Sequence, residues 1–344
     1  MFVYFTRRLL YLIPMLLGIS FLIYLGLELT PGDVISYLLP PEAIADLKPE
    51  ELMAMREALG LNDPFIIRYF YWLGGILQGD FGYSLASGVP ISQLVLDRIP
   101  ATLELSVAAL LFSTLFGVIL GSISALKRGS LMDNSLTFFG MIGVSIPEFI
   151  FGLIALVVFA LQLEWLPVGK RLMPGYDSYW DHMPHLVMPA MVLGLIMTAG
   201  AMRYTRSSML DSLNKEFIRT ARSKGVSPLR DSLATSGLNK EFIRTARSKG
   251  VPEWRVNFIH GLRVALIPVV VLIGFRLPML IGGTVIIEQV FQWPGVGDLF
   301  VNAVRGQNYP LVMMISFLSV TAVLFASFMI DLLTALLDPR VKLE

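Results

Sequence analysis

Cysteine is absent from the 344-residue sequence, and histidine occurs only three times. Without thiols the chain can form no disulfide framework, thiolate metal site or iron–sulfur ligand set. The histidines, His182, His185 and His260, are too few and too dispersed to suggest a metal cluster. We therefore expect no metal site and no other cofactor in this chain.

The motifs of several common enzyme classes are also missing. The sequence has no Gly-Lys-Ser/Thr phosphate-binding loop, so we do not expect this chain to bind ATP itself. It has neither the His-Glu-x-x-His pair of a metalloprotease nor the Gly-x-Ser-x-Gly nucleophile elbow of a hydrolase. The sequence therefore predicts a protein that is not an enzyme.

Charged residues are scarce, and apolar residues come in long runs. Only 15% of the residues are charged and 55% are hydrophobic, whereas about a quarter of the residues of a soluble domain are charged. A helix of about 20 apolar residues crosses a hydrocarbon core of about 30 Å. The composition therefore predicts an all-α, polytopic membrane protein.

Six segments are predicted as transmembrane helices, each bounded by charged or Pro/Gly-rich sequence. They are residues 9–29, 101–125, 135–163, 186–202, 264–287 and 311–337. The first segment resembles a signal peptide because Arg7 and Arg8 precede it. Its apolar run is too long for one, and no small-residue cleavage site follows, so we expect it to remain as a helix.

Lysine and arginine gather on one side of the predicted spans. With the N-terminus inside, 19 of the 27 Lys and Arg residues fall in cytoplasmic segments and seven in the opposite ones. The remaining one, Arg276, falls within a span. Because cytoplasmic loops carry an excess of Lys and Arg, both termini are expected in the cytoplasm.

The predicted layout has four parts. Residues 1–29 form the N-terminal tail and first span, residues 30–100 an extracytoplasmic loop, residues 101–337 a core of five further spans, and residues 338–344 a cytoplasmic tail. The extracytoplasmic loop contains a helix signal, with Pro49 at a first helical position, acidic residues Glu50 and Glu51 in the first turn, and Gly60 as the stop.

A second long connection, residues 204–263, carries a short-helix signal on the cytoplasmic side. Asn239 suits an N-cap, Glu241 lies near the positive helix end, and Gly250 suits the C-terminal stop. Such a short helix is marginal alone, and its small apolar face around Phe242 suits docking into a groove on a partner. The alternative is a solvated basic loop.

An ordered set of motifs runs along nearly the whole chain. It comprises Arg7-Arg8, Leu12-Ile13-Pro14, Pro31-Gly32-Asp33, Leu59-Gly60-Leu61-Asn62-Asp63-Pro64, Gly79-Asp80-Phe81-Gly82, Pro100-Ala101-Thr102-Leu103-Glu104, Trp293-Pro294-Gly295-Val296-Gly297 and Leu337-Asp338-Pro339-Arg340. The cytoplasmic helix, followed after Gly250 by Leu266-Ile267-Pro268, resembles the "EAA" signature of ABC importer permeases. Together the motifs resemble the dipeptide/oligopeptide and nickel type, in particular the first of its two permeases.

This resemblance implies a type I ABC importer permease that forms a path for di- or oligopeptides across a bacterial or archaeal inner membrane. Oligosaccharides and nickel chelates are the alternative solutes. The implied partners are a second homologous permease, two ABC ATPase subunits that hydrolyse ATP, an extracytoplasmic solute-binding protein and membrane lipid. No nucleic-acid partner is expected.

The resemblance also implies which residues couple to the ATPase, namely Glu241, Phe242, Ala246, Arg247 and Gly250. One feature departs from the family, which has a single copy of this motif: residues 214–226 recur identically as residues 239–251. The first copy supplies Glu216, Ala221 and Gly225 as an alternative set. We favour the second copy because it keeps the family's distance to Pro268.

Three ionisable residues are candidates for the translocation path. Arg276 lies about 18 Å along the fifth predicted span, near the middle of the bilayer, where a charge must face protein or a wet cavity. The functional hypothesis is that Arg276, Glu104 and Glu148 line the path and that Arg276 meets the carboxylate end of the solute. The alternative is a structural pair of Arg276 with Glu104 or Glu148.

Other features leave further choices open. Glu288 is expected at the outer interface, and the tryptophan turns 165–167 and 293–295 fit either contact with a solute receptor or anchoring at the interface. An ion-coupled secondary transporter built on Arg276, Glu104 and Glu148 is the alternative of a different class. It would normally show two similar or inverted halves, which this sequence lacks, and it gives the docking loop no purpose.

Overall fold

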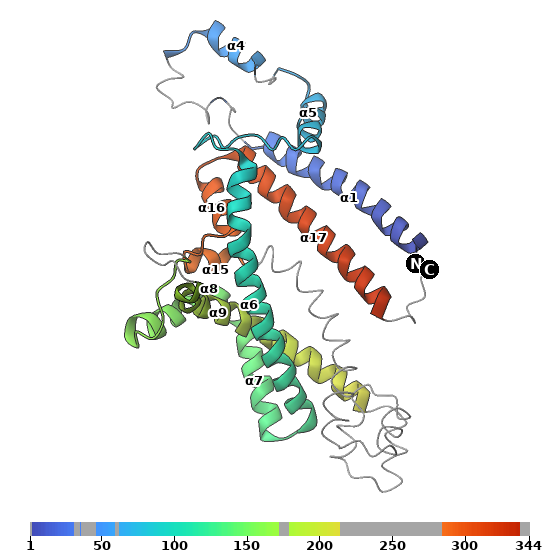
Figure 1. Cartoon of the computed structure of the whole chain (residues 1–344), viewed down its shortest axis with the longest axis vertical. Coiled ribbons are helices and arrows are strands. Elements are labelled where there is room, and N and C mark those ends of the chain that lie inside the picture. The colour runs from blue at the N-terminus through green and yellow to red at the C-terminus, as the bar shows by residue number, and fades with distance from the viewer. Residues whose placement is uncertain are drawn as a thin grey trace. The chain divides into compact units, whose positions relative to one another are not determined.

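The computed structural model describes residues 2–30, 35, 46–58, 62–171, 179–213 and 284–337 (Figure 1). Within these ranges the regular elements are helices, and the only strand-like pairing is an isolated β-bridge between Tyr83 and Pro90. The prediction of an all-α protein is confirmed for the described part of the chain. The helices belong to two compact units.

Long apolar helices account for most of the predicted spans. Among the described residues, four single helices are long and apolar enough to cross a membrane: Phe5–Glu28, Ile91–Ala125, Trp180–Ser207 and Tyr309–Leu332. They correspond to the predicted spans 9–29, 101–125, 186–202 and 311–337. A bent helix pair corresponds to the predicted span 135–163 and raises the number of spans to as many as five. The predicted span 264–287 lies almost entirely outside the described residues.

The bent pair differs from the straight span that hydropathy predicts. Helix α7 (Leu131–Ser145) is followed by α8 (Glu148–Ala155) and the π-helix η1 (Leu156–Gln162), with an angle of 101° at the break. Ile146 is extended, with ψ of 128°, because the ring of Pro147 disfavours helical geometry in the preceding residue. The segment is therefore a broken span or a re-entrant loop.

In the first unit, α1 (Phe2–Glu28) packs against α5 (Phe65–Leu77) through aromatic rings. Tyr24 and Tyr69 are both buried, with ring centroids 5.8 Å apart. The Tyr69 hydroxyl lies 2.8 Å from the Ser20 hydroxyl. This aromatic contact ties the segment that follows the first span back onto that span.

The predicted helix in the long loop is present as α4 (Pro49–Ala58), with Pro49 as its first residue and Glu50 and Glu51 in its first turn. The Glu51 carboxylate accepts a hydrogen bond from the Lys48 backbone N–H at 2.9 Å, which satisfies a donor that the helix start leaves free. The expected stop at Gly60 lies outside the described residues. The helix signal is confirmed over the described length.

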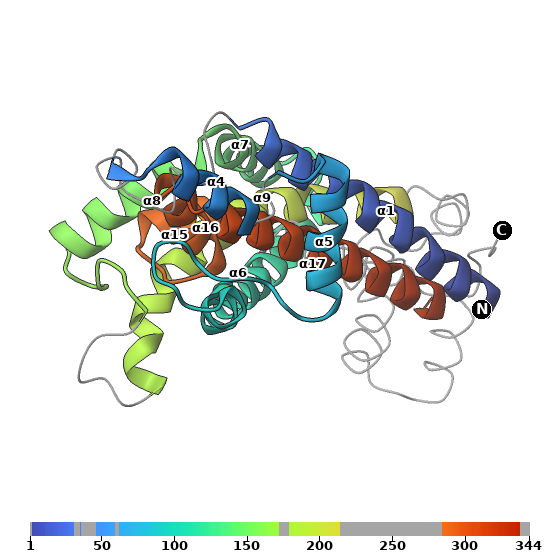
Figure 2. The same cartoon turned by 90° about the horizontal axis from the view of Figure 1, so that it is seen from above.

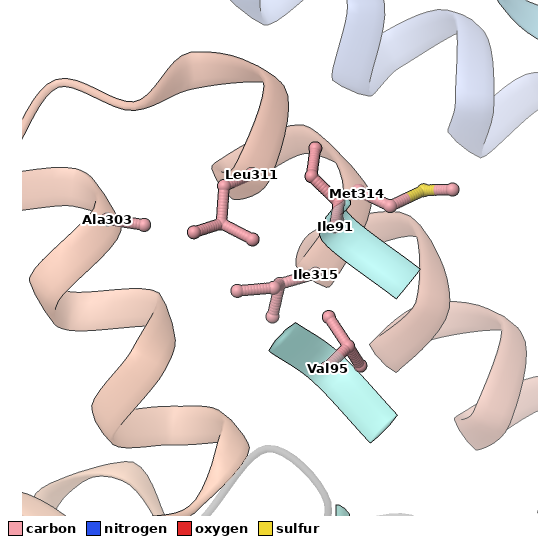
Figure 3. Close-up of a cluster of buried hydrophobic side chains, with 6 residues drawn as sticks. All are labelled: Ile91, Val95, Ala303, Leu311, Met314 and Ile315. Carbon is pink, nitrogen blue, oxygen red and sulfur yellow. The ribbon is translucent and has the colours of Figure 1, made fainter. Parts of the chain in front are cut away.

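A hydrophobic cluster forms the core of the first unit (Figure 3). It joins the start of α6 (Ile91–Leu126), α16 (Val296–Arg305) and α17 (Tyr309–Leu337), and its buried members are Ile91, Val95, Ala303, Leu311, Met314 and Ile315. Helix α6 has 36 residues, about 54 Å at 1.5 Å per residue, which exceeds a hydrocarbon core of about 30 Å. The helix begins at Ile91, whereas the predicted span starts at residue 101, so part of α6 lies outside the predicted span.

In the second unit, the later part of α6 packs closely on α9 (Tyr179–Leu213) at glycine residues. A methyl group on Gly121 would lie 2.6 Å from the Met202 carbonyl oxygen, and one on Gly117 would overlap Ala201. Helix α9 also lies beside α7 and α8 (Figure 2). Small residues four apart let helix backbones approach this closely in membrane proteins.

Candidate functional site

The residues predicted to couple to an ATPase fall outside the described part of the chain. They are Glu241, Phe242, Ala246, Arg247 and Gly250, with Glu216, Ala221 and Gly225 of the first copy. Arg276 also lies outside the described residues. Of the predicted path residues, Glu104 and Glu148 are described.

Glu104 is engaged in an ion pair with Arg171. The Arg171 Nε donates to Glu104 Oε2 at 2.6 Å, and the side chains are 24% and 15% exposed respectively. Arg171 lies in the segment after the π-helix, so the pair joins that segment to α6. Glu104 therefore has a cationic partner in Arg171, without recourse to Arg276.

Glu148 occupies the first turn of α8, directly after Pro147 at the break. Its carboxylate lies where the first backbone N–H groups of that helix have no helical partner, a position that favours negative charge. No ion pair or hydrogen bond joins Glu148 to Glu104 or Arg171, all of which are described. The two predicted carboxylates are thus held by different local structures.

Glu288, in α15 (Val285–Val290), is fully buried in the first unit. Its Oε1 accepts hydrogen bonds from the Thr102 hydroxyl at 2.8 Å and the Thr284 hydroxyl at 3.1 Å. Its Oε2 accepts from the Asp298 backbone N–H at 2.9 Å. Burial raises the pKa of the Glu288 carboxyl, and these donors act in the opposite direction. Glu288 is thus an internal anchor of the first unit, and its place at the outer interface stays a prediction.

The segment after Glu288 is shaped around this carboxylate. A Cβ added to Gly297 would lie 2.8 Å from Glu288 Oε2, and one added to Gly295 would overlap the same group. The Val296 backbone N–H donates to the Thr102 hydroxyl at 2.8 Å. Only residues without a side chain fit at the two glycine positions, which explains the local Pro-Gly-Val-Gly sequence in physical terms.

Trp293 is fully buried, and its Nε1 donates to the Ala101 carbonyl oxygen at 2.7 Å. The turn at 293–295 therefore holds α6 from inside the unit, and the two surface roles considered for Trp293 are wrong. Trp165, in the other turn, is 69% exposed. A surface role remains a prediction for Trp165 only.

A second buried ionic centre lies in the second unit, at the ends of three helices. Arg206 in α9 forms two hydrogen bonds to Asp133 in α7, Nε to Oδ1 at 2.8 Å and Nη2 to Oδ2 at 2.9 Å. The Ser124 hydroxyl at the end of α6 donates to Oδ1, and the Gly129 backbone N–H donates to Oδ2 at 2.9 Å. Hereafter we call Ser124, Asp133 and Arg206 the Asp133 clamp.

Sequence reasoning missed the Asp133 clamp, although one local signal pointed to it. Ser130 is the N-cap of α7, and its side chain accepts from the Asp133 backbone N–H at 3.2 Å. A Ser followed three residues later by an acidic residue before an apolar run is a helix-start pattern. The pattern places Asp133 at a helix start, and it carries no information on the distant Arg206.

These features define a polytopic helical membrane protein with a sharply bent apolar helix pair and ionic links between its helices. A family model described as "Binding-protein-dependent transport system inner membrane component" matches residues 117–230 and 232–343. A second family model, described as "Binding-prot-dependent transport system membrane comp, N-term", matches residues 1–106. The chain belongs to the family of binding-protein-dependent transport system inner membrane components.

Full-length similarity to named permeases agrees with the family. The oligopeptide transport system permease protein AppB of Bacillus subtilis (strain 168) is 38% identical over 98% of this chain and 99% of its own length. The di/tripeptide transport system permease protein DppB of Pseudomonas aeruginosa is 35% identical over 98% of each chain. The glutathione transport system permease protein GsiC of Salmonella typhimurium is 32% identical over 98% of each chain.

Family membership and the apolar helices make this chain a multi-pass inner membrane protein and a permease subunit of an ABC importer, which works with ATPase and binding-protein partners. The two matches of the family model meet at residue 231. That point lies between the repeated blocks 214–226 and 239–251. The match to the family model is thus interrupted between the two copies.

Proposed function

We propose that this chain forms one half of the translocation path of a peptide importer, with di- or oligopeptides as its solutes. The observation that carries the proposal is the full-length similarity to permeases named for oligopeptides, di/tripeptides and glutathione. Each of these solute classes contains peptide bonds and a carboxylate. The ordered motifs from Arg7-Arg8 to Leu337-Asp338-Pro339-Arg340 support the same assignment.

The path lies between this permease and a second, homologous one, both surrounded by lipid. A binding protein delivers the peptide to the outer face, and two ATPase subunits hydrolyse ATP on the inner face. Both termini of the permease lie in the cytoplasm, as the excess of Lys and Arg in the connections on that side supports.

The cytoplasmic helix of residues 239–250 receives the movement of the ATPase. Its acidic start at Glu241, its apolar side at Phe242 and Ala246, and its stop at Gly250 suit insertion into a groove. The first copy, with Glu216, Ala221 and Gly225, is the alternative docking element. Only one copy can occupy a single groove, and the spacing of the second copy to Pro268 favours it.

Arg276 meets the peptide carboxylate within the path, because an arginine near mid-bilayer is stable only against protein or water. Glu104 already forms an ion pair with Arg171. It therefore does not need Arg276 as a structural partner, which supports a role of Arg276 in the path. Glu148 at the helix break is the second ionisable residue proposed for the path.

Uptake by reconstituted vesicles tests the proposed function. Both permeases and both ATPases are placed in liposomes with the binding protein outside, and entry of a labelled tripeptide is followed. We expect uptake that requires internal ATP and the binding protein and that unlabelled peptides compete away. Competition by an oligosaccharide or a nickel chelate instead would show that the solute is not a peptide. Uptake by the permease alone under an ion gradient would show that the protein is a secondary transporter.

A further inference from the structure

The Asp133 clamp lies near the C-terminal end of α9, the helix that directly precedes the repeated motif in the sequence. Helix α9 is continuous from Tyr179 to Leu213, and Arg206 lies in its last two turns. The first copy of the repeat begins at residue 214, directly after the helix. A displacement of the loop at residue 214 therefore acts on the helix that carries Arg206.

The clamp saturates the Asp133 carboxylate. Its side chain is 3% exposed, whereas the Arg206 side chain is 29% exposed. Both oxygens accept two hydrogen bonds each, one from the Arg206 fork and one from Ser124 or Gly129. A planar guanidinium bound through two parallel hydrogen bonds sets both distance and orientation, which a lysine ammonium would not do.

Loss of either charge is costly at this position. A buried ion pair stabilises little compared with apolar residues, but removing one partner leaves the other charge without compensation. The pair therefore selects one arrangement of the three helix ends over others. A link of this kind suits helices whose relative positions must stay fixed when one of them is displaced.

Close packing extends the same link along the helices. Gly117 and Gly121 of α6 contact Ala201 and Met202 of α9, within the two turns that precede Arg206. The contacts are tight enough that an added methyl group would overlap the facing helix. Helices α6 and α9 are thus in close contact at Gly117 and Gly121, and the Asp133 clamp links them again near their C-terminal ends.

We propose that Asp133 and Arg206 are positioning residues that make α6, α7 and α9 move as one body when the ATPase displaces the loop after α9. The inference rests on the proposed function and adds to it the route by which movement reaches the spans. This role requires no contact of the pair with solute or nucleotide. Its loss lets α9 move while α6 and α7 stay behind, so that ATP is hydrolysed without transport.

The test compares ATP hydrolysed per peptide transported in reconstituted complexes. Asp133→Asn keeps the shape of the side chain and removes its charge, and Arg206→Lys keeps the charge and removes the fork. We expect both to assemble and to raise the ratio by about 2-fold to 30-fold, the range of coupling changes seen for residues that link distant sites. Ser124→Ala, which removes one neutral donor, should raise the ratio less.

Glu28→Gln is the matched control. Glu28 accepts from Arg68 Nη2 at 2.6 Å, so this variant breaks an ion pair of similar length in the first unit. We expect its ratio to equal that of the wild type. A wild-type ratio in assembled Asp133→Asn or Arg206→Lys would overturn the inference, as would an equal rise in Glu28→Gln. Absence of ATP-driven uptake by the wild type would instead reject the proposed function.

Discussion

Thr102 uses its hydroxyl group twice, as donor to Glu288 and as acceptor from the Val296 backbone N–H. It is buried at 5% exposure. Water therefore has little access to replace either hydrogen bond. A substitution that keeps the shape of Thr102 and removes its hydroxyl leaves two buried polar groups short of a partner.

We predict that Thr102→Val lowers the free energy of unfolding by about 1–3 kcal/mol, the usual penalty for an unsatisfied buried group. The measurement is the thermal midpoint of the purified complex. It is obtained by heating samples to different temperatures and measuring the remaining intact complex by size-exclusion chromatography. Thr102→Ser keeps the hydroxyl and serves as control, with a smaller loss from the missing methyl group. An unchanged midpoint in Thr102→Val would mean that the Glu288 anchor contributes nothing to stability.

Residue-scale contacts could be predicted from sequence only where they are local. Pro49 and Glu50 predict the start of α4, because a helix start is a property of neighbouring residues. Thr102 and Glu288 are 186 residues apart, and Asp133 and Arg206 are 73 apart. A repeat in the local sequence carries no information on such distant pairs, so neither the partners of Glu288 nor the Asp133 clamp were predicted.

At the scale of elements, glycine determines how closely α6 and α9 approach. Gly117 and Gly121 are four residues apart on α6, and both face α9 at Ala201 and Met202. The Gly-x-x-x-Gly spacing is visible in the sequence and is a known signal for close helix pairs in membranes. It does not name the partner helix, which only the structure gives.

We predict that Gly117→Ala destabilises the protein by about 1–3 kcal/mol, because the new methyl group overlaps Ala201 and forces the helices apart. Gly18→Ala is the matched control, since a Cβ at Gly18 in α1 has no heavy atom within 4 Å. Its thermal midpoint should equal or exceed that of the wild type. Equal midpoints for the two variants would show that α6 and α9 do not pack as closely as described.

The helix break at Pro147 is a feature that hydropathy does not predict. Residues 135–163 are mostly apolar, with Glu148 as their only charged residue, so a sliding window predicts one span. The proline is visible in the sequence, but proline is tolerated inside membrane helices, as at Pro100 in α6. The sequence therefore does not distinguish a bend of 101° from a mild kink.

At the scale of the whole molecule, the absence of cysteine makes orientation directly measurable. Ala86 lies in an exposed turn before α6, and Arg128 lies in an exposed turn between α6 and α7. We predict that a membrane-impermeant maleimide labels Ala86→Cys in intact spheroplasts and labels Arg128→Cys only after permeabilisation. The wild type, without thiols, gives the background. The reverse pattern would place the termini outside and contradict the proposed orientation.

We propose above that a separate ATPase drives transport through the cytoplasmic helix of the second copy. The most direct measurement is co-purification with the ATPase, followed by peptide-stimulated hydrolysis and uptake for the wild type, Gly250→Pro and a variant lacking one 25-residue repeat. We predict that the ATPase co-purifies with the wild type, that Gly250→Pro hydrolyses ATP with little uptake, and that the deletion retains both activities. An ATPase that never binds, together with uptake under an ion gradient alone, would instead make the protein a secondary transporter.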